Sequence, residues 1–261
     1  MATMAVGHQI RQWRERRRLS QMQLALEAEI SPRHLSFIET GRSQPSTGTI
    51  DRLAEQLDIP YRARNGLLTA AGFAARHGER TLDDPAMTVA RRSVEHILKG
   101  HEPYPAIAVD RHWNIVATND AISFFTEQIG DALLTPPMNA IKLALHPEGL
   151  APQVVNLGEW HAHVLEQLDQ QIAVTADPGL VALREEVSSY PHESDYEAPP
   201  ADPDRIWVPL ILDTVVGRLS FISTITIFGT PVDITLSELA IEAFFPADEH
   251  TAEILHKNWT R

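Results

Sequence analysis

One short segment, residues 31–43, carries the side chains with the clearest chemical potential in this sequence. If residues 32–40 form a helix, Arg33 lies on its outer side, and arginine can donate two parallel hydrogen bonds to O6 and N7 of guanine. The ring of Phe37 would offer an apolar surface to thymine methyl groups or to a second copy of the chain. Such a segment predicts contact with double-stranded DNA. The candidate contact residues are Ser31, Pro32, Arg33, His34, Ser36, Phe37, Arg42 and Ser43.

Two helix starts would position this set. Ser20 is a good N-cap, because its hydroxyl can accept hydrogen bonds from the first backbone N–H groups of a helix, where Gln21 could also hold a phosphate. Ser31 and Pro32 mark a second start, and Gly41 suits the left-handed residue that follows a helix end. The two caps are 11 residues apart, which leaves room for two short helices and a tight turn. This spacing is typical of a helix-turn-helix, with a plain helical hairpin as the alternative.

Other chemistries find little support in the sequence. The chain has no cysteine, which excludes thiolate catalysis and cysteine-bound metals. His161 and His163 are two residues apart and would point in different directions on a helix, so we expect no metal site. Asp195 and Glu197 lie in an acidic, proline-rich stretch and are better explained as solvated loop acids than as a catalytic pair. With no Walker, GxSxG or HExxH motif in the sequence, we expect neither an enzyme nor a cofactor.

Charge divides the chain into two parts. The 261 residues carry a net charge of −13 and are enough for two domains, each with its own core. Residues 1–80 hold 12 Arg against eight acidic residues, a net charge of +4, whereas residues 81–261 have a net charge of −17. We therefore expect any nucleic acid to bind the N-terminal part. The N-terminus lacks the apolar core of a signal peptide, and no apolar run is long enough to span a bilayer, so we expect a cytoplasmic protein without membrane contact.

The apolar periodicity predicts an all-α domain over residues 1–75. A first helix at residues 6–18 would bury Val6, Ile10 and Trp13, and its arginine-rich end RERRR would face DNA phosphates. Two further helices would follow the motif and end at Gly72, giving five in all. Residues 76–102 are then a polar linker and a connecting helix that begins at Asp84.

A change in composition after residue 102 predicts a second domain, residues 103–261. Residues 106–110 and 115–119 have the pattern of a β-hairpin, and a proline-divided helical insertion follows up to residue 190. Residues 192–204 are too polar to pack into a core, so we expect them to form a mobile loop. Three strands should complete the domain at residues 206–212, 216–228 and 232–243, with a bulge at residues 237–238, before a last helix at residues 249–259. This order predicts an α+β, PAS-like fold with a five-stranded antiparallel sheet covered on one side by the inserted helices.

A sheet covered in this way can enclose a pocket. Its wall would consist of bulky amphipathic side chains that have an apolar body and a polar tip. Arg111, His112 and Arg218 are the cationic candidates that could hold a carboxylate head group, although each could instead pair with an acidic neighbour. The candidate ligand-binding residues are Arg111, Trp113, Trp160, His163, Trp207, Arg218, Phe221 and Phe244.

Four stretches together resemble a known family. They are LSQMQLALEAEISPRHLSFIETGRSQPS, YPAIAVDRHWNIVATN, LHPEGLAPQVVNLGEWHAHVL and FGTPVDITLSELAIEAFFPAD. In this order they are similar to Xre-type helix-turn-helix transcription regulators that carry an MmyB-like, PAS-like ligand-binding domain. The resemblance implies a regulator whose effector domain accommodates a fatty acid or a similar apolar molecule, with Gln21 and the outward residues of the second motif helix facing DNA. Phe37 departs from the usual polar recognition helix.

Two functions therefore remain open on the sequence. The first is a homodimeric, sequence-specific DNA-binding regulator that recognises a palindromic operator and senses a small apolar ligand, possible examples being fatty acids. The second is an antitoxin-like repressor whose acidic C-terminal domain binds a protein partner, mediates dimerisation and has a filled core without a ligand cavity.

Overall fold

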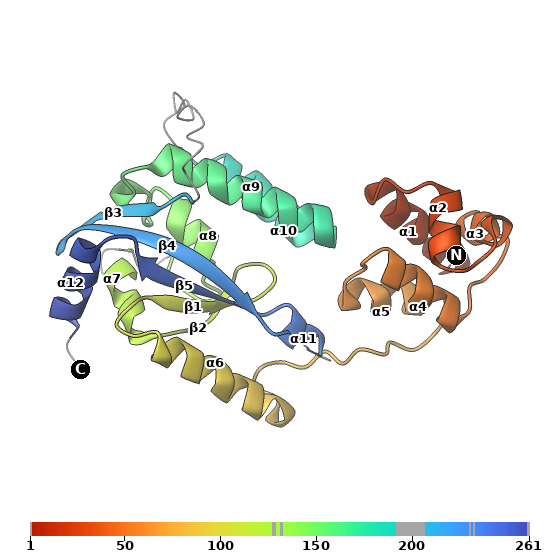
Figure 1. Cartoon of the computed structure of the whole chain (residues 1–261), viewed down its shortest axis with the longest axis horizontal. Helices are drawn as coiled ribbons and strands as arrows, with labels where there is room; N and C mark the ends of the chain where they lie inside the picture. Colours follow the sequence, from red (N-terminus) through yellow and green to blue (C-terminus); the bar gives the residue numbers. More distant parts are fainter. Residues whose placement is uncertain are drawn as a thin grey trace. The chain divides into compact units, whose positions relative to one another are not determined.

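The protein was examined as a computed structural model, which describes residues 2–126, 129–130, 133–191, 207–229, 231 and 233–259, without the side chains of residues 2–5. The chain folds into two compact units, with the boundary between them after Glu79 (Figure 1). This boundary falls inside the polar stretch expected to separate the domains. Each unit has its own core and is described by itself.

The N-terminal domain consists of five short helices, as predicted. They are α1 (Ala2–Arg16), α2 (Gln21–Glu27), α3 (Pro32–Glu39), α4 (Thr47–Gln56) and α5 (Tyr61–Ala70). Each is too short to be stable alone, so burial of one apolar face holds the bundle together. Fully buried Ile10, Leu24, Leu35, Ile50 and Leu67 come one from each helix. The first helix ends two residues earlier than expected, since Arg18 adopts a left-handed conformation with φ 58°.

A close approach between α1 and α3 fixes the orientation of α3. A Cβ atom at Gly7 would lie 2.0 Å from the carbonyl oxygen of Ile38, which no rotation of a side chain could relieve. The absence of a side chain at Gly7 therefore lets the backbone of α1 reach the end of α3.

The C-terminal domain is built on a five-stranded antiparallel sheet with the strand order β2-β1-β5-β4-β3 (Figure 1). The strands are β1 (Ala106–Val109), β2 (Ile115–Thr118), β3 (Leu210–Thr214), β4 (Gly217–Ile227) and β5 (Ala240–Pro246). The last strand lies in the centre, where β1 and β4 pair with it on either side. This order confirms the predicted α+β architecture.

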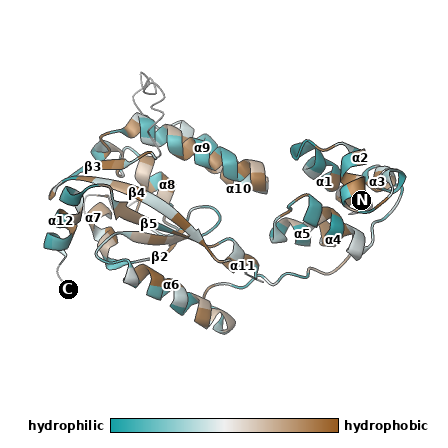
Figure 2. Ribbon diagram, viewed as in Figure 1, coloured by the Kyte–Doolittle hydropathy of each residue, from teal (hydrophilic) through white to brown (hydrophobic). Residues whose placement is uncertain are grey.

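Helices cover both faces of the sheet, whereas the sequence predicted a cover on one side. On one face, Val94 and Leu98 of α6 (Thr88–Gly100) pack with Ala108 and Ile241. The other face carries the larger core, shared with the helices inserted between β2 and β3 (Figures 1 and 2). The elements outside the sheet are η1 (Pro85–Met87), α6, η2 (Asp120–Ile122), α7 (Ser123–Thr126), α8 (Ala140–Leu145), η3 (Ala151–Gln153), α9 (Leu157–Thr175), α10 (Pro178–Ser188), α11 (Ile234–Ser237) and α12 (Glu249–Asn258).

The prediction of a strand over residues 232–243 is wrong in its first half. Ile234–Ser237 forms the helical turn α11, and β5 begins only at Ala240. At residues 237–238, where a bulge was expected, the chain instead changes from helix to strand. Leu236 and Leu239 can therefore pack in the same core. The acidic stretch 192–204 and the start of the strand expected at residue 206 lie outside the described residues.

We expect Gly7→Ala to lower the free energy of unfolding of the N-terminal domain by roughly 1–3 kcal/mol, because backbone must move to admit the methyl group. Gly48→Ala is the matched control, since a Cβ atom at this position in α4 meets no heavy atom within 4 Å. Urea unfolding of the two variants measures the difference. Equal stabilities would contradict the close approach.

Candidate functional site

The helix-turn-helix motif is formed by α2 and α3 as the sequence predicted. The Ser20 hydroxyl accepts a hydrogen bond from the Gln23 backbone N–H at 3.2 Å, and the Gln23 side chain accepts one from the Ser20 backbone N–H at 2.9 Å. The Ser31 hydroxyl accepts from the His34 backbone N–H at 3.1 Å, with Pro32 in the first turn. Both caps fix where a helix begins and therefore which side chains of α3 face outward.

A buried ion pair locks α3 to α1. The Arg14 guanidinium donates from Nε and Nη2 to the two carboxylate oxygens of Glu39, at 2.7 and 2.9 Å. These side chains are 10% and 1% exposed, and Arg14 also donates to the carbonyl oxygen of Leu19 at 2.9 Å. The hydrogen bonds that Arg14 donates to Glu39 raise the pKa of Arg14 above its ordinary value. The expectation that Arg14 faces phosphates with the rest of RERRR is wrong, because its charge is used inside the fold.

Gln21 joins this network from the first residue of α2. Its amide Nε2 donates to Glu39 Oε2 at 2.7 Å. One amide hydrogen and the carbonyl oxygen of the Gln21 side chain are not used in this bond, so the predicted phosphate contact stays a prediction. The sequence analysis missed the link between Gln21, Arg14 and Glu39, which are far apart in the chain.

The outward surface of α3 centres on Phe37. Two guanidinium groups lie over its half-buried ring, with Arg33 Cζ 5.3 Å and Arg42 Cζ 6.0 Å from the ring centroid. The Phe37 carbonyl oxygen accepts hydrogen bonds from the backbone N–H groups of Arg42 and Ser43, at 2.8 and 3.1 Å. Phe37 thus positions two arginines that are nine residues apart in the sequence.

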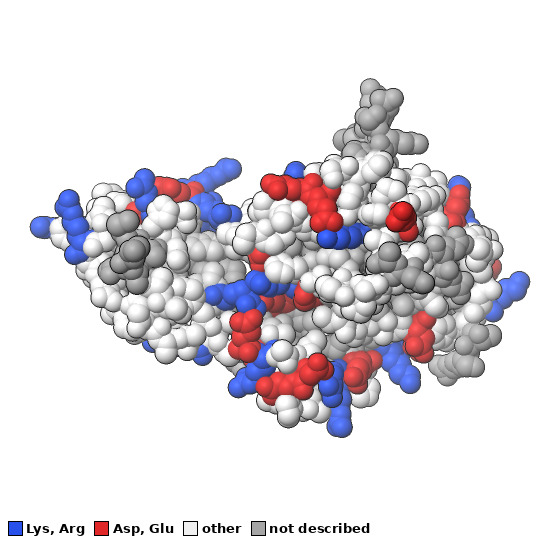
Figure 3. Space-filling model, turned by 180° about the vertical axis from the view of Figure 1, so that it is seen from behind, with Lys and Arg blue, Asp and Glu red and all other residues white. Residues whose placement is uncertain are grey.

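The other predicted contact residues lie around this centre. Ser31, Pro32, Arg33 and Arg42 are exposed, whereas His34, Ser36, Phe37 and Ser43 are partly buried. His34 Nε2 is buried and has no hydrogen-bond partner within the described part of the chain. The charged side chains visible on this domain in Figure 3 are mainly basic and lie along its edges. We call the set formed by Arg33, Phe37 and Arg42 the arginine–aromatic surface.

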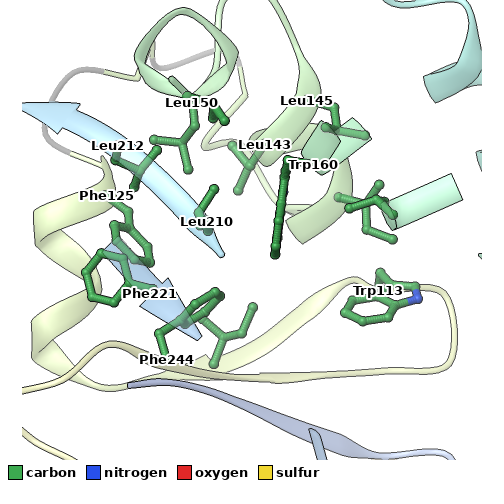
Figure 4. Close-up of a cluster of buried hydrophobic side chains, with 14 of the residues drawn as sticks. Trp113, Phe125, Leu143, Leu145, Leu150, Trp160, Leu210, Leu212, Phe221 and Phe244 are labelled. Carbon is green, nitrogen blue, oxygen red and sulfur yellow. The ribbon is translucent and has the colours of Figure 1, made fainter. Parts of the chain in front are cut away.

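The C-terminal domain contains an apolar cavity between the sheet and the inserted helices. Its volume is about 80 Å³, counted as the space open to the centre of a water-sized sphere. Figure 4 shows the aromatic and leucine side chains that crowd this part of the core. The lining residues are Ile107, Trp113, Ile115, Ile122, Phe125, Thr126, Ile129, Ala140, Ile141, Leu143, Ala144, Leu150, Trp160, Val164, Gln167, Leu210, Glu242 and Phe244.

Three of the predicted ligand-binding residues line this cavity: Trp113, Trp160 and Phe244. The Trp113 indole donates to Gln171 Oε1 at 2.9 Å, which fixes its ring. Trp160 Nε1 is buried and has no hydrogen-bond partner among the residues that the structure describes. It is therefore a donor that an oxygen or nitrogen of a ligand could satisfy.

Five other predicted residues are not part of the lining. Phe221 packs beside it, with ring centroids 5.2 Å from Phe125, and His163 lies against the outer side of Trp160 at 5.5 Å. Trp207 is 45% exposed. The two cations are paired with acidic neighbours, Arg111 with Asp177 at 2.9 Å and Arg218 with Asp213 at 2.7 Å.

The sequence analysis missed Glu242, which lines the apolar cavity from the middle of β5. Its residue exposure is 8%, and burial raises the pKa of its carboxyl group to about 7, although a hydrogen bond with Ser223 opposes this. Glu242 was hidden in the strand sequence AIEAFF, where one polar residue in an alternating pattern suggests a solvent-facing position.

A second, more polar hollow, of about 400 Å³ when counted in the same way, lies between α8, α10 and the turn of the β1–β2 hairpin. Leu143 lines both hollows. The charged groups around the second hollow are paired: Lys142 Nζ lies 2.7 Å from Glu186, and His112 Nε2 lies 3.1 Å from Asp177. Burial is the largest single influence on the pKa of Asp177 and raises it. Hydrogen bonds with His112 and Gly179, together with the charge of Arg111, outweigh burial, so the pKa lies below its ordinary value.

Neither a metal centre nor a membrane span was found within the described ranges. No three His, Asp or Glu side chains among these residues come together as metal ligands. Within the same ranges, no helix has the length and apolar composition needed to cross a membrane.

Comparisons with known proteins assign both parts of the chain. Residues 90–257 match the family model of the MmyB-like transcription regulator ligand binding domain, and residues 5–67 match a helix-turn-helix domain model. The chain is 44% identical over 68 residues to the HTH-type transcriptional repressor RghR of Bacillus subtilis, a match that covers 26% of this chain and about half (48%) of that protein.

Two further relatives are more limited in what they support. An uncharacterized HTH-type transcriptional regulator of Bacillus subtilis, RghRB, is 34% identical over 101 residues, 35% of this chain and 70% of that protein. The solved structure of the clp gene regulator ClgR from Corynebacterium glutamicum has 20% identity and a TM-score of 0.25, covering 40% of this chain and 96% of that one. This structural likeness is too low to carry an argument.

We expect Arg14→Met and Glu39→Leu each to lower the free energy of unfolding of the N-terminal domain by roughly 3 kcal/mol, because each leaves a buried charge without its partner. The double variant should be more stable than either single variant. A double-mutant cycle from urea unfolding measures this coupling. The exposed pair Arg11 and Glu15 is the control, for which we expect no measurable coupling; equal coupling in the two pairs would contradict the role of burial.

Glu242 should make the stability of the C-terminal domain depend on pH. Its carboxyl group has a pKa of about 7 in the fold and about 4.5 when unfolded, so the fold favours the protonated form. The stabilisation is complete below about pH 4.5 and is lost as the pH rises to about 7, with a total loss of roughly 3 kcal/mol. Urea unfolding of wild type and Glu242→Gln across this range tests it. The variant should gain stability over wild type as the pH rises, and parallel pH profiles would contradict the prediction.

Proposed function

Because the chain belongs to the helix-turn-helix transcription regulators with an MmyB-like ligand-binding domain, we propose that it binds an operator as a homodimer and that a mostly apolar small molecule in the C-terminal cavity controls this binding. The observation that carries the proposal is the combination of a doubly capped helix-turn-helix and an apolar cavity in one chain. The expected alternative, a protein-binding domain with a filled core, agrees less well with such a cavity.

The arginine–aromatic surface is the proposed DNA-reading element. Arg33 and Arg42 are both exposed and both held against Phe37, so less side-chain freedom is lost when they bind. Arg33, in the first turn of α3, is suited to base edges, and Arg42, after the helix, to the backbone. One motif of this size contacts few base pairs, which favours two copies on a palindrome with half-sites about 34 Å apart.

The cavity supports the ligand part of the proposal. An acyl chain gains roughly 0.8 kcal/mol for each CH₂ group it buries there. A fatty acid is one candidate, with its carboxylate directed through the region of Leu143 to the polar hollow near Lys142. Highly charged ligands such as nucleotides are disfavoured, since residues 81–261 have a net charge of −17.

To regulate, the ligand must bind one arrangement of the two DNA-binding modules better than the other. The helix α6 is the proposed transmitting element. It packs on the face of the sheet opposite the cavity and follows directly on the N-terminal domain in sequence.

The DNA part is tested by selecting an operator from a random duplex library with the full chain and then measuring fluorescence anisotropy. Arg33→Ala should relax base preference and weaken specific binding by roughly 1–3 kcal/mol, because base contacts carry specificity. Arg42→Ala should weaken all duplexes by a similar factor and reduce the slope of log affinity against log salt concentration by about one.

The matched control is Arg52→Ala, which removes the same charge from an exposed position on α4. We expect it to leave the ranking of sequences unchanged. Identical losses for Arg33, Arg42 and Arg52, or binding that does not depend on salt, would overturn the proposed reading surface.

A further inference from the structure

The position of Glu242 in the sheet gives the cavity its chemical character. Side chains of β5 alternate, so Glu242 and Phe244 face the cavity while Ile241 and Ala243 face the α6 side. The strand neighbours of Glu242 are Ile107 on β1 and Ile225 on β4. Apart from Ser223, which pairs with Phe244, the neighbours of the carboxyl group on this sheet face are apolar.

Glu242 has little inside the protein to compensate its charge. The hydrogen bond with Ser223 favours the ionised form, yet burial outweighs it. Of the lining residues that the structure describes, Glu242 is the only ionisable one, so no protein cation reaches it from the walls of the cavity. A buried carboxylate in such surroundings is stabilised most by a cation that also donates a hydrogen bond.

We propose that Glu242 determines the specificity of the cavity, and that the ligand is an apolar molecule with a basic nitrogen that donates to the Glu242 carboxylate. This inference rests on the proposed ligand-binding function and narrows it to lipophilic amines. Trp160 Nε1, which has no hydrogen-bond partner among the described residues, adds a donor to the same cavity, so a ligand that also has an acceptor would satisfy both groups.

The charge of the whole domain acts in the same direction. A net charge of −17 over residues 81–261 concentrates cations near the domain and repels anions. A carboxylate placed deep in the cavity would face the like charge of Glu242, or would require that group to stay protonated. A fatty acid could avoid this only with its head group at the other end of the cavity, away from Glu242.

Three probes of equal chain length separate the possibilities: decylamine and decanoate, each below its micelle concentration, and 1-decanol below its solubility limit. Their binding to the full chain at pH 7.5 is measured by calorimetry. We expect decylamine to bind about tenfold or more tightly than 1-decanol, the change that a charge-assisted hydrogen bond confers, and decanoate to bind weakest. Glu242→Gln should abolish the advantage of decylamine and leave 1-decanol within about threefold.

The control variant is Glu253→Gln, which makes the same change in charge at an exposed position on α12. It should keep the wild-type order of the three probes. The wild-type order alone also tests the inference if the Glu242 variant fails to fold, which its melting curve would reveal.

The outcomes distinguish this inference from the function on which it rests. If decanoate binds best, or if the three probes bind wild type equally, the role of Glu242 is overturned while a ligand-binding cavity stands. Loss of amine preference in both variants overturns it too, since the effect would then be one of overall charge. If none of the probes binds, the proposed sensing function fails together with the inference.

Discussion

A charge inside an apolar interior has to be compensated, and this constraint organises both domains. In the N-terminal domain the compensation is internal. Arg14 and Glu39 make two hydrogen bonds to each other, and Leu19 and Gln21 satisfy further donor and acceptor positions. Removing one partner of such a pair leaves a buried charge uncompensated. This lowers the stability of the fold more than replacing both partners by apolar residues does. The network therefore holds the first motif helix, the second motif helix and α1 in one arrangement.

That arrangement is the precondition of any DNA contact. Gly7 lets α1 approach the backbone at Ile38, and Glu39 receives Arg14 one residue later. With the end of α3 fixed, the chain turns so that Arg42 returns to the ring of Phe37, on which Arg33 already lies. The outward surface is thus set by contacts on the inward side of the same helix.

Sequence reasoning predicted what local chemistry determines. The caps at Ser20 and Ser31 depend on residues within three positions, and both form as expected. The hairpin of β1 and β2 and the three later strands also followed from alternation and turns, whereas the pairing of β1 with β5, which are far apart in the sequence, was not predicted. The failure at residues 234–237 has a local cause as well, because a short apolar run is equally compatible with a helical turn.

Long-range pairing could not be predicted in this way. Arg14 looked like one more member of a basic run, and only the fold brings Glu39 to it across 25 residues. Arg111 and Arg218 looked like head-group cations, and the fold brings acidic partners to both. Glu242 is the opposite case, since an ordinary position in a strand becomes unusual only when helices close over that face of the sheet.

The contrast between the two domains bears on how a ligand could act. Arg14 and Glu39 are compensated within the protein, whereas Glu242 is met by Ser223 and otherwise by an apolar cavity. A group whose ionisation is opposed by the fold stores free energy that a suitable partner releases. Binding of that partner would act first on β5, where Ile241, the residue before Glu242, packs with Val94 and Leu98 of α6 on the other face. A shift of the central strand would therefore be transmitted through close packing rather than through a mobile loop, because packed side chains cannot give way independently.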